Sequence, residues 1–187
     1  MNPLKTFGKN ALSVYNNIHN NHVIRGLGGI KFMKNDFQRI LLENCAASED
    51  LDINLNSLNF DFTSKPLLIG GKAMEYYQIR ESGNDIDFVI TEDDYERLSY
   101  KYPNHIKELW GDFGVCRNKF EMWKSICLFD YDFLSEEAVE TGDFLIISFE
   151  KLMFLKVLAM RQPKYLRDLE LMRDRMAEIN TLLHDYY

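Results

Sequence analysis

The sequence predicts an α/β (α+β) protein in which a short mixed β-sheet is flanked by helices. Short apolar runs of strand length, at residues 67–69 and 86–90, alternate with longer stretches in which apolar residues recur every three or four positions. Glycine pairs and helix-capping residues separate these runs. From residue 149 the periodicity is helical to the end of the chain, which indicates that helices follow the sheet.

We expect three segments: an N-terminal helical segment (1–60), a core (61–148) and C-terminal helices that pack on the core (149–187). The N-terminal segment contains an amphipathic helix over residues 30–47. Thr91 has the side chain to cap the helix that follows the second strand. The remaining expected elements, in order, are strand 66–69, helix 72–79, strand 86–90, extended segments 114–117 and 122–129, a helix around 135–139, strand 145–147, and helices 149–160 and from 163 onward.

Composition indicates a folded chain with ample material for a core. Of the 187 residues, 46% are hydrophobic and 27% are charged, which excludes a disordered chain. The net charge of −7 argues against a protein that coats nucleic acid nonspecifically, because phosphate contacts require a surplus of Lys and Arg.

The cysteines and the N-terminus indicate a cytoplasmic protein. Cys45, Cys116 and Cys127 are widely spaced and form no CxxC pair, as expected for reduced thiols. The first 21 residues are polar, and no run approaches the ~20 apolar residues that a membrane span needs. We therefore expect no signal peptide and no membrane partner.

Asp85 and Asp87 are the candidate metal ligands. Residues two apart in a strand point to the same face, so the two carboxylates would lie side by side. Such a pair repels unless a cation compensates, and Mg²⁺ or Mn²⁺ takes carboxylate oxygens together with substrate phosphates. Upstream, Gly70 and Gly71 allow backbone amides to approach phosphates, and Lys72 in the same turn either touches a phosphate or faces water.

Each of these features alone has a plainer explanation. A single Asp-x-Asp is usually a solvated strand end, and a glycine pair is usually a tight turn. Their combination in order, with fourteen positions from Gly71 to Asp85 and a helix between them, favours one site that binds both a metal and a triphosphate.

The run G-G-K-A-M, then Arg80-Glu81-Ser82, then D-I-D-F resembles the nucleotidyltransferase superfamily, which has the DNA polymerase beta fold. Within it, the run is most similar to the AbiEii-like group, which includes toxins of bacterial toxin–antitoxin systems. That group's pattern reads roughly G-G-x-A-L, then R-x-S/T-x-D-I/L-D, and this chain has one extra residue between Ser82 and Asp85. The resemblance covers residues 66–90 closely and 122–172 loosely.

The resemblance implies roles for further residues. It assigns Arg80 and Ser82 to nucleotide binding, and it requires a third carboxylate on a later strand as base or metal ligand. Asp130 is the candidate and Asp132 the alternative, and the other of the two would cap the helix that follows. A Lys on a following helix corresponds to Lys156, whose anionic partner would be the triphosphate unless the side chain reaches solvent.

The expected function is transfer of a nucleoside monophosphate from a nucleoside triphosphate to a hydroxyl or amine. The Mg²⁺-dependent enzyme would use Asp85, Asp87 and Asp130, and a tRNA, a protein or a small molecule is the candidate acceptor. A cognate antitoxin is a candidate partner. The alternative is a non-catalytic nucleotide-binding or antitoxin-like module, against which the intact set of carboxylates argues.

Overall fold

The computed structural model describes residues 51–185, so the expected helix over residues 30–47 lies outside the described part of the chain. The described residues belong to two units, which meet in sequence between Leu155 and Lys156. This boundary falls inside a helix. The two units are described separately below.

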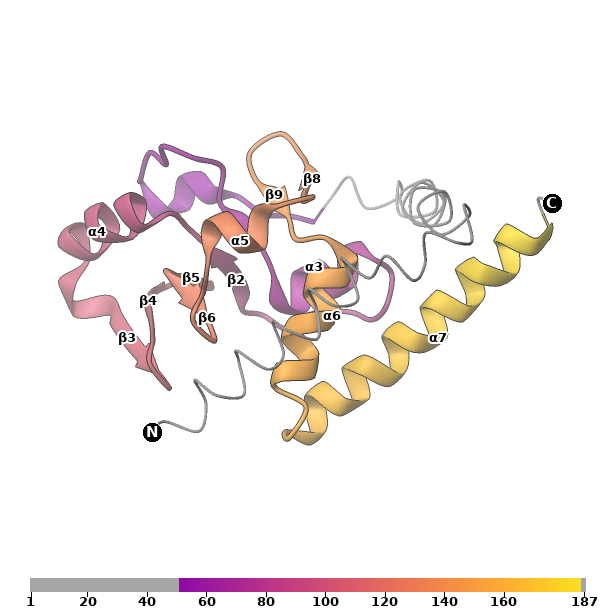
Figure 1. Ribbon diagram of the computed structural model, residues 1–187. Coiled ribbons are helices and arrows are strands. Elements are labelled where there is room, and N and C mark those ends of the chain that lie inside the picture. The colour runs from indigo at the N-terminus through magenta and orange to yellow at the C-terminus, as the bar shows by residue number, and fades with distance from the viewer. Residues whose placement is uncertain (1–50, 186–187) are drawn as a thin grey trace. The chain divides into compact units, whose positions relative to one another are not determined.

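The elements of the structure are labelled in Figure 1. Their bounds in chain order are η2 (Leu55–Leu58), β1 (Leu67–Leu68), α3 (Gly70–Tyr76), β2 (Ile86–Val89), α4 (Glu92–Lys101), η3 (Pro103–His105), β3 (Ile106–Leu109), β4 (Asp112–Arg117), β5 (Phe120–Trp123), β6 (Ser125–Ile126), β7 (Phe129–Asp130), α5 (Tyr131–Ser135), β8 (Val139–Glu140), β9 (Leu145–Ile146), α6 (Phe149–Leu158) and α7 (Pro163–Asp185).

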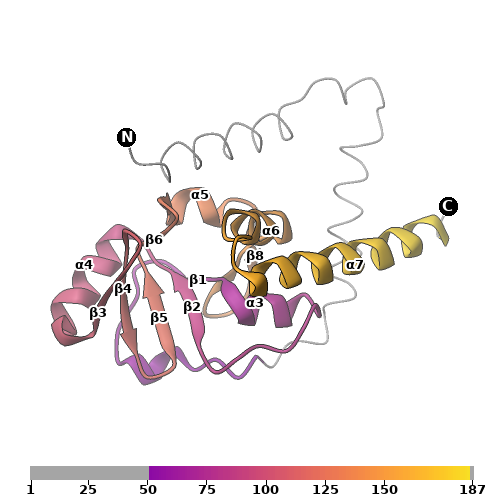
Figure 2. The ribbon, with the colours of Figure 1, turned by 90° about the horizontal axis from the view of Figure 1, so that it is seen from below.

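A mixed sheet organises the unit of residues 51–155, which confirms the predicted α/β class. The described strands join in the order β3-β4-β5-β2-β1-β9-β8, and Figure 2 shows β4, β5 and β2 side by side. Strand β2 is parallel to β5 and antiparallel to β1, and β1 is parallel to β9. A second, two-stranded sheet pairs β6 with β7. Strand β2, which carries the Asp-x-Asp pattern, therefore lies in the interior of the larger sheet.

One face of this sheet is buried along four strands, and Val89 and Trp123 bury part of the opposite face. Leu68, Phe88, Met122 and Val115 are neighbours in register across β1, β2, β5 and β4, and each is at most 1% exposed. Large apolar side chains that alternate along strands bury one face in this way, which explains why these short segments form strands. The other face carries the intervening residues, among them Asp87.

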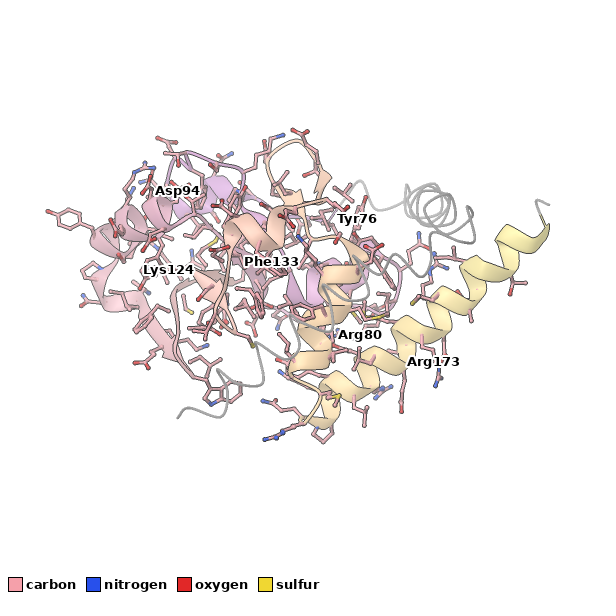
Figure 3. The ribbon with its side chains drawn as sticks, in the orientation of Figure 1. Tyr76, Arg80, Asp94, Lys124, Phe133 and Arg173 are labelled. Atoms are coloured by element: carbon pink, nitrogen blue, oxygen red, sulfur yellow. The ribbon has the colours of Figure 1, made fainter. Side chains whose placement is uncertain are left out.

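Helix α4 begins where the sequence predicts. The Thr91 hydroxyl accepts a hydrogen bond from the Asp94 amide at 3.3 Å, and three acidic residues occupy the first turn, where the helix dipole favours them. Asp94, labelled in Figure 3, is fully buried. Its carboxylate accepts hydrogen bonds from the amides of Thr63 (3.0 Å) and Ser64 (3.3 Å) and from the Arg97 guanidinium (2.7 Å). This carboxylate therefore fixes the segment before β1 to α4.

Helix α5 differs from the prediction in position and in its cap. It spans Tyr131–Ser135 instead of residues around 135–139, and Val139 lies in strand β8. A buried lysine, Lys151 on α6, donates hydrogen bonds to the Phe133 carbonyl and, at 3.0 Å, to the Glu136 carboxylate. These contacts fix the end of α5 against α6, which the local sequence of α5 does not reveal.

Strand β3 is an element that the sequence does not predict. All four of its residues are exposed, and it forms an edge of the sheet beside β4. Because an edge strand with both faces in water needs no apolar alternation, the run Ile-Lys-Glu-Leu has no recognisable strand pattern.

The unit that contains residues 156–185 consists, in its described part, of the end of α6 and the long helix α7. Pro163 is the first residue of α7, a position where its missing N–H costs nothing. Among the described residues no helix is both long enough and apolar enough to cross a membrane.

Candidate functional site

The glycine turn and the Asp-x-Asp strand are in direct contact. The Ile69 amide donates to the Asp87 carbonyl at 2.9 Å, which aligns the end of β1 with β2. Gly70 follows with a φ of +66°, and a Cβ at this position would lie 2.1 Å from Oδ2 of Asp87. Only glycine fits here, because a side chain would meet both the backbone strain of this region and the carboxylate. Strands β1 and β2 are thus adjacent and antiparallel.

Glu121 lies beside Asp87 on the neighbouring strand. Asp87 of β2 is the register partner of Glu121 of β5, and Glu121 is the register partner of Cys116 of β4. Register partners point to the same face of a sheet, with strands about 4.8 Å apart. Asp85 precedes β2 by one residue and is exposed. Asp87 and Glu121 therefore point to the same face of the sheet, and Asp85 lies near enough for its charge to act on Lys107 and Cys116. These three carboxylates are hereafter called the acidic cluster.

Lys107 of the edge strand reaches this cluster. Its Nζ lies 3.0 Å from Oε1 of Glu121. The hydrogen bond to Glu121 is the largest influence that raises the pKa of Lys107, and the charge of Asp85 acts in the same direction. Burial is the largest influence on the Cys116 thiol and raises its pKa to about 11. The negative charges of Glu121, Asp87 and Asp85 act in the same direction. Cys116 is therefore a neutral thiol at physiological pH, and we assign it no nucleophilic role.

The chemistry of the acidic cluster suits Mg²⁺, although within residues 51–185 no three His, Cys, Asp or Glu side chains are grouped closely enough to hold a metal by themselves. Mg²⁺ at nucleotide sites commonly takes one or two carboxylates and completes its shell with water and phosphate oxygens. Asp85 and Asp87 supply that number of hard oxygen donors. The absence of a side chain at Gly70 lets the Asp87 carboxylate lie directly against the backbone of the turn.

The loop that precedes β2 is fixed to α3 through Glu75, a residue that the sequence analysis did not single out. Its carboxylate accepts hydrogen bonds from Lys72 Nζ at 3.0 Å and from the Ser82 amide at 3.1 Å. The Ser82 side chain, and after it Lys72, hold the pKa of Glu75 below its usual value despite its partial burial. Gly71 packs under this loop, since a Cβ there would lie 3.5 Å from the Ser82 Cβ.

Of the residues assigned to the nucleotide, Gly70, Gly71, Lys72 and Ser82 are thus brought together at one end of α3. Arg80, labelled in Figure 3, lies in the same loop and donates to the Glu81 carbonyl at 2.8 Å. The link from Lys72 through Glu75 to Ser82 means that Lys72 already has an anionic partner within the protein.

The helix cap expected from Asp132 is provided by Asp130. Its side chain is exposed and caps α5, with Oδ1 accepting from the Phe133 amide at 2.9 Å. We had assigned the capping role to Asp132 by assuming that the strand continues through residues 122–129. Instead, Cys127 and Leu128 both have positive φ and form the tight turn of the β6–β7 hairpin, whose strands belong to the separate sheet. The candidate for the third carboxylate is Glu121.

Lys156 also differs from its expected role. Its Nζ lies 2.8 Å from Oδ2 of Asp168, and both residues are about 95% buried. Its ammonium also lies 5.0 Å from the ring centroid of Tyr165. The anionic partner that an inward lysine needs is therefore supplied by α7 of the same unit.

Glu121 had one sequence signal. It stands between Phe120 and Met122, two fully buried residues of β5, so it is a charge in the middle of an apolar strand. Its neighbour Asp87 comes from a strand more than thirty residues earlier, so the pairing needs the sheet register.

Comparison of the chain with protein families, with curated proteins and with solved structures finds no match.

Proposed function

We propose that the protein is a Mg²⁺-dependent nucleotidyltransferase whose active site is the acidic cluster together with the Gly70-Gly71 turn. The observation that carries this proposal is the contact of Gly70 with the Asp87 carboxylate. It joins a backbone that can approach a phosphate to a carboxylate that can hold a metal, and these two residues are seventeen positions apart in the sequence.

In the proposed reaction a hydroxyl or amine of the acceptor attacks the α-phosphorus of the nucleoside triphosphate in line with the leaving group. A new P–O or P–N bond forms, the bond from the α-phosphorus to the bridging oxygen breaks, and pyrophosphate leaves with that electron pair. The proton lost by the acceptor passes to Glu121. Asp85 and Asp87 would hold Mg²⁺, which supplies charge neutralisation at the phosphates.

Calorimetric titration of the protein with each nucleoside triphosphate, with and without Mg²⁺, tests the binding step. We expect Mg²⁺ to tighten binding in the wild type and to have no effect in the Asp85→Asn/Asp87→Asn double variant. Asp130→Asn is the matched control, since it changes an exposed carboxylate that serves only α5. Wild-type Mg²⁺ dependence in the double variant would place the nucleotide elsewhere.

The transfer step is tested by incubating the protein with α-labelled triphosphates, Mg²⁺ and a cell extract. Label that migrates with tRNA, with protein or with a small molecule identifies the acceptor. We expect Glu121→Gln to abolish transfer while triphosphate binding persists, and Asp130→Asn to transfer normally. Binding without transfer to any acceptor in the wild type would favour the non-catalytic nucleotide-binding module.

A further inference from the structure

Two tight turns bring apolar side chains to the surface at one end of the larger sheet. The turn that joins β3 to β4 exposes 73% of Trp110, and the turn that joins β6 to β7 exposes 59% of Leu128. Leu109 and Phe113, which lie next to the first turn, are also exposed. These four residues are hereafter called the apolar tip. Single apolar residues are common on protein surfaces, whereas a group of large ones is typical of a binding surface.

Asp112 fixes the two turns to each other. Its carboxylate accepts hydrogen bonds from the amides of Cys127 at 2.7 Å and Leu128 at 3.3 Å, and from the Ser125 hydroxyl at 3.0 Å. Asp112 is also the register partner of Leu109. Leu128 therefore lies beside the β3–β4 hairpin, and the two turns form one surface.

Trp110 and Leu128 both occupy backbone positions that suit other residue types. Their φ angles are +55° and +72°, in the left-handed region where Gly and Asn are favoured and a bulky side chain is strained. Trp110 and Gly111 form a two-residue hairpin turn in which both φ angles are positive, and Asn-Gly is the preferred sequence for such a turn. Because neither side chain is buried, packing does not account for these residue types. Binding of a partner does.

The charges beside the apolar tip indicate the kind of partner. Glu108 is the register partner of Phe113, and within residues 51–185 it forms no ion pair. Asp112 accepts hydrogen bonds from neutral groups alone. These two carboxylates disfavour nucleic acid and anionic membranes, which are negatively charged. They favour an apolar protein surface bordered by Lys and Arg, since complementary charges select a partner.

A second copy of the chain fits this surface poorly. Its own tip would bring the same two carboxylates, in a protein with a net charge of −7. Pairing of the edge strand β3 with itself is also unfavourable. In a two-fold antiparallel pair, any register that uses three of the four residues places Lys107 opposite Lys107 or Glu108 opposite Glu108. Like charges directly opposite each other destabilise a strand pair.

We propose that the apolar tip is a docking surface for a basic amphipathic segment of another protein. Trp110 is the central anchor, since exposed tryptophans that become buried contribute most to binding at many protein interfaces. Glu108 and Asp112 contact the Lys and Arg side chains that flank the apolar residues of the partner.

Tryptophan fluorescence tests this proposal directly, because the only other tryptophan, Trp123, is 3% exposed. The probe is a synthetic helical peptide of leucine and lysine with one apolar face, and its control carries glutamate in place of lysine. We expect the lysine peptide to shift the emission of Trp110 to shorter wavelength and to protect it from quenching by acrylamide. The glutamate peptide should do neither.

Trp110→Asn separates binding from folding. Because Asn suits this turn, the melting temperature should equal or exceed that of the wild type, whereas affinity for the lysine peptide, measured by calorimetry, should fall at least about tenfold. Leu128→Asn makes the same test at the second turn, and it decides the question if the first variant does not fold. Tyr100→Ala is the matched control, since it removes an exposed aromatic side chain from α4 and should leave the affinity unchanged.

A second pair of variants tests the role of charge. Glu108→Gln should weaken binding of the lysine peptide by about threefold, whereas Asp143→Asn, which removes an exposed charge between β8 and β9, should not. Equal weakening by these two variants, wild-type affinity in Trp110→Asn, or no binding of the lysine peptide would overturn the inference. A shift in Trp110 emission with rising protein concentration alone would also overturn it and assign the tip to a second copy of the chain.

Discussion

Gly70→Ala should separate the role of the glycine turn in folding from its role in the site. With φ at +66°, an alanine at this position costs about 1–2 kcal/mol in backbone strain. The new Cβ would also lie 2.1 Å from Oδ2 of Asp87, so the carboxylate must leave its position, at about 0.5–1.5 kcal/mol for a distorted side-chain torsion. A gain of about 0.4–1 kcal/mol from the stiffer unfolded chain offsets part of this cost.

The net loss in the free energy of unfolding is then about 2 kcal/mol, which corresponds to a fall in melting temperature of about 4–8 °C for a chain of this size. Because the displaced group is Asp87, Mg²⁺-dependent triphosphate binding should be lost even at temperatures where the variant is fully folded. Gly71→Ala is the matched control. Its nearest contact would be an ordinary 3.5 Å, and its φ is not positive, so its stability should stay close to wild type.

Two measurements test this prediction. They are calorimetric titration with a triphosphate and Mg²⁺ at 15 °C and thermal melting of both variants. If Gly70→Ala melts like Gly71→Ala and binds the triphosphate like the wild type, the close contact between the turn and the carboxylate does not exist in solution, and the basis of the proposed function fails with it.

Three further outcomes follow from the described contacts. Asp130→Ala should lower the free energy of unfolding by about 1 kcal/mol through loss of the α5 cap, with nucleotide transfer retained, as urea denaturation and a labelled-transfer assay would measure. Lys156→Met should destabilise by about 3–5 kcal/mol because it leaves Asp168 charged and buried, and Lys156→Met/Asp168→Leu should recover most of this loss in the same denaturation assay. Since burial raises the pKa of Cys116 to about 11, its alkylation by iodoacetamide should be slow at pH 8 and accelerate as the pH rises toward 11, followed by mass spectrometry of the modified peptide.

The order of strands and helices around β2 could be predicted because its signals are local. Two apolar runs, a glycine pair and a capping threonine identify β1, β2 and the start of α4 from the residues themselves. The contact of Gly70 with Asp87 follows from pairing those two runs. These features need no knowledge of distant segments.

The third carboxylate could not be placed in the same way. The strand alternation expected along residues 122–129 ends at Cys127 and Leu128, which both have a left-handed backbone conformation. Neither residue type predicts that conformation. Glu121 lies beside Asp87 because β5 pairs in parallel with β2. Lys107 lies near Glu121 because it belongs to an edge strand, and that strand has no apolar alternation by which the sequence could predict it. Likewise, Lys156 finds Asp168 because α7 returns alongside α6, which the periodicity of either helix does not specify.

The sheet order also bears on when the acidic face can form during synthesis. Strands β2 to β5 are successive in the chain, so a nascent polypeptide that has emerged as far as Trp123 already contains every strand of that face. Strand β1 can pair with β9 only after Leu145 and Ile146 have been synthesised. Because contacts close in sequence form faster than distant ones, we expect the meander that carries Glu121 and Lys107 to fold early and the parallel pairing of β1 with β9 to close the sheet last.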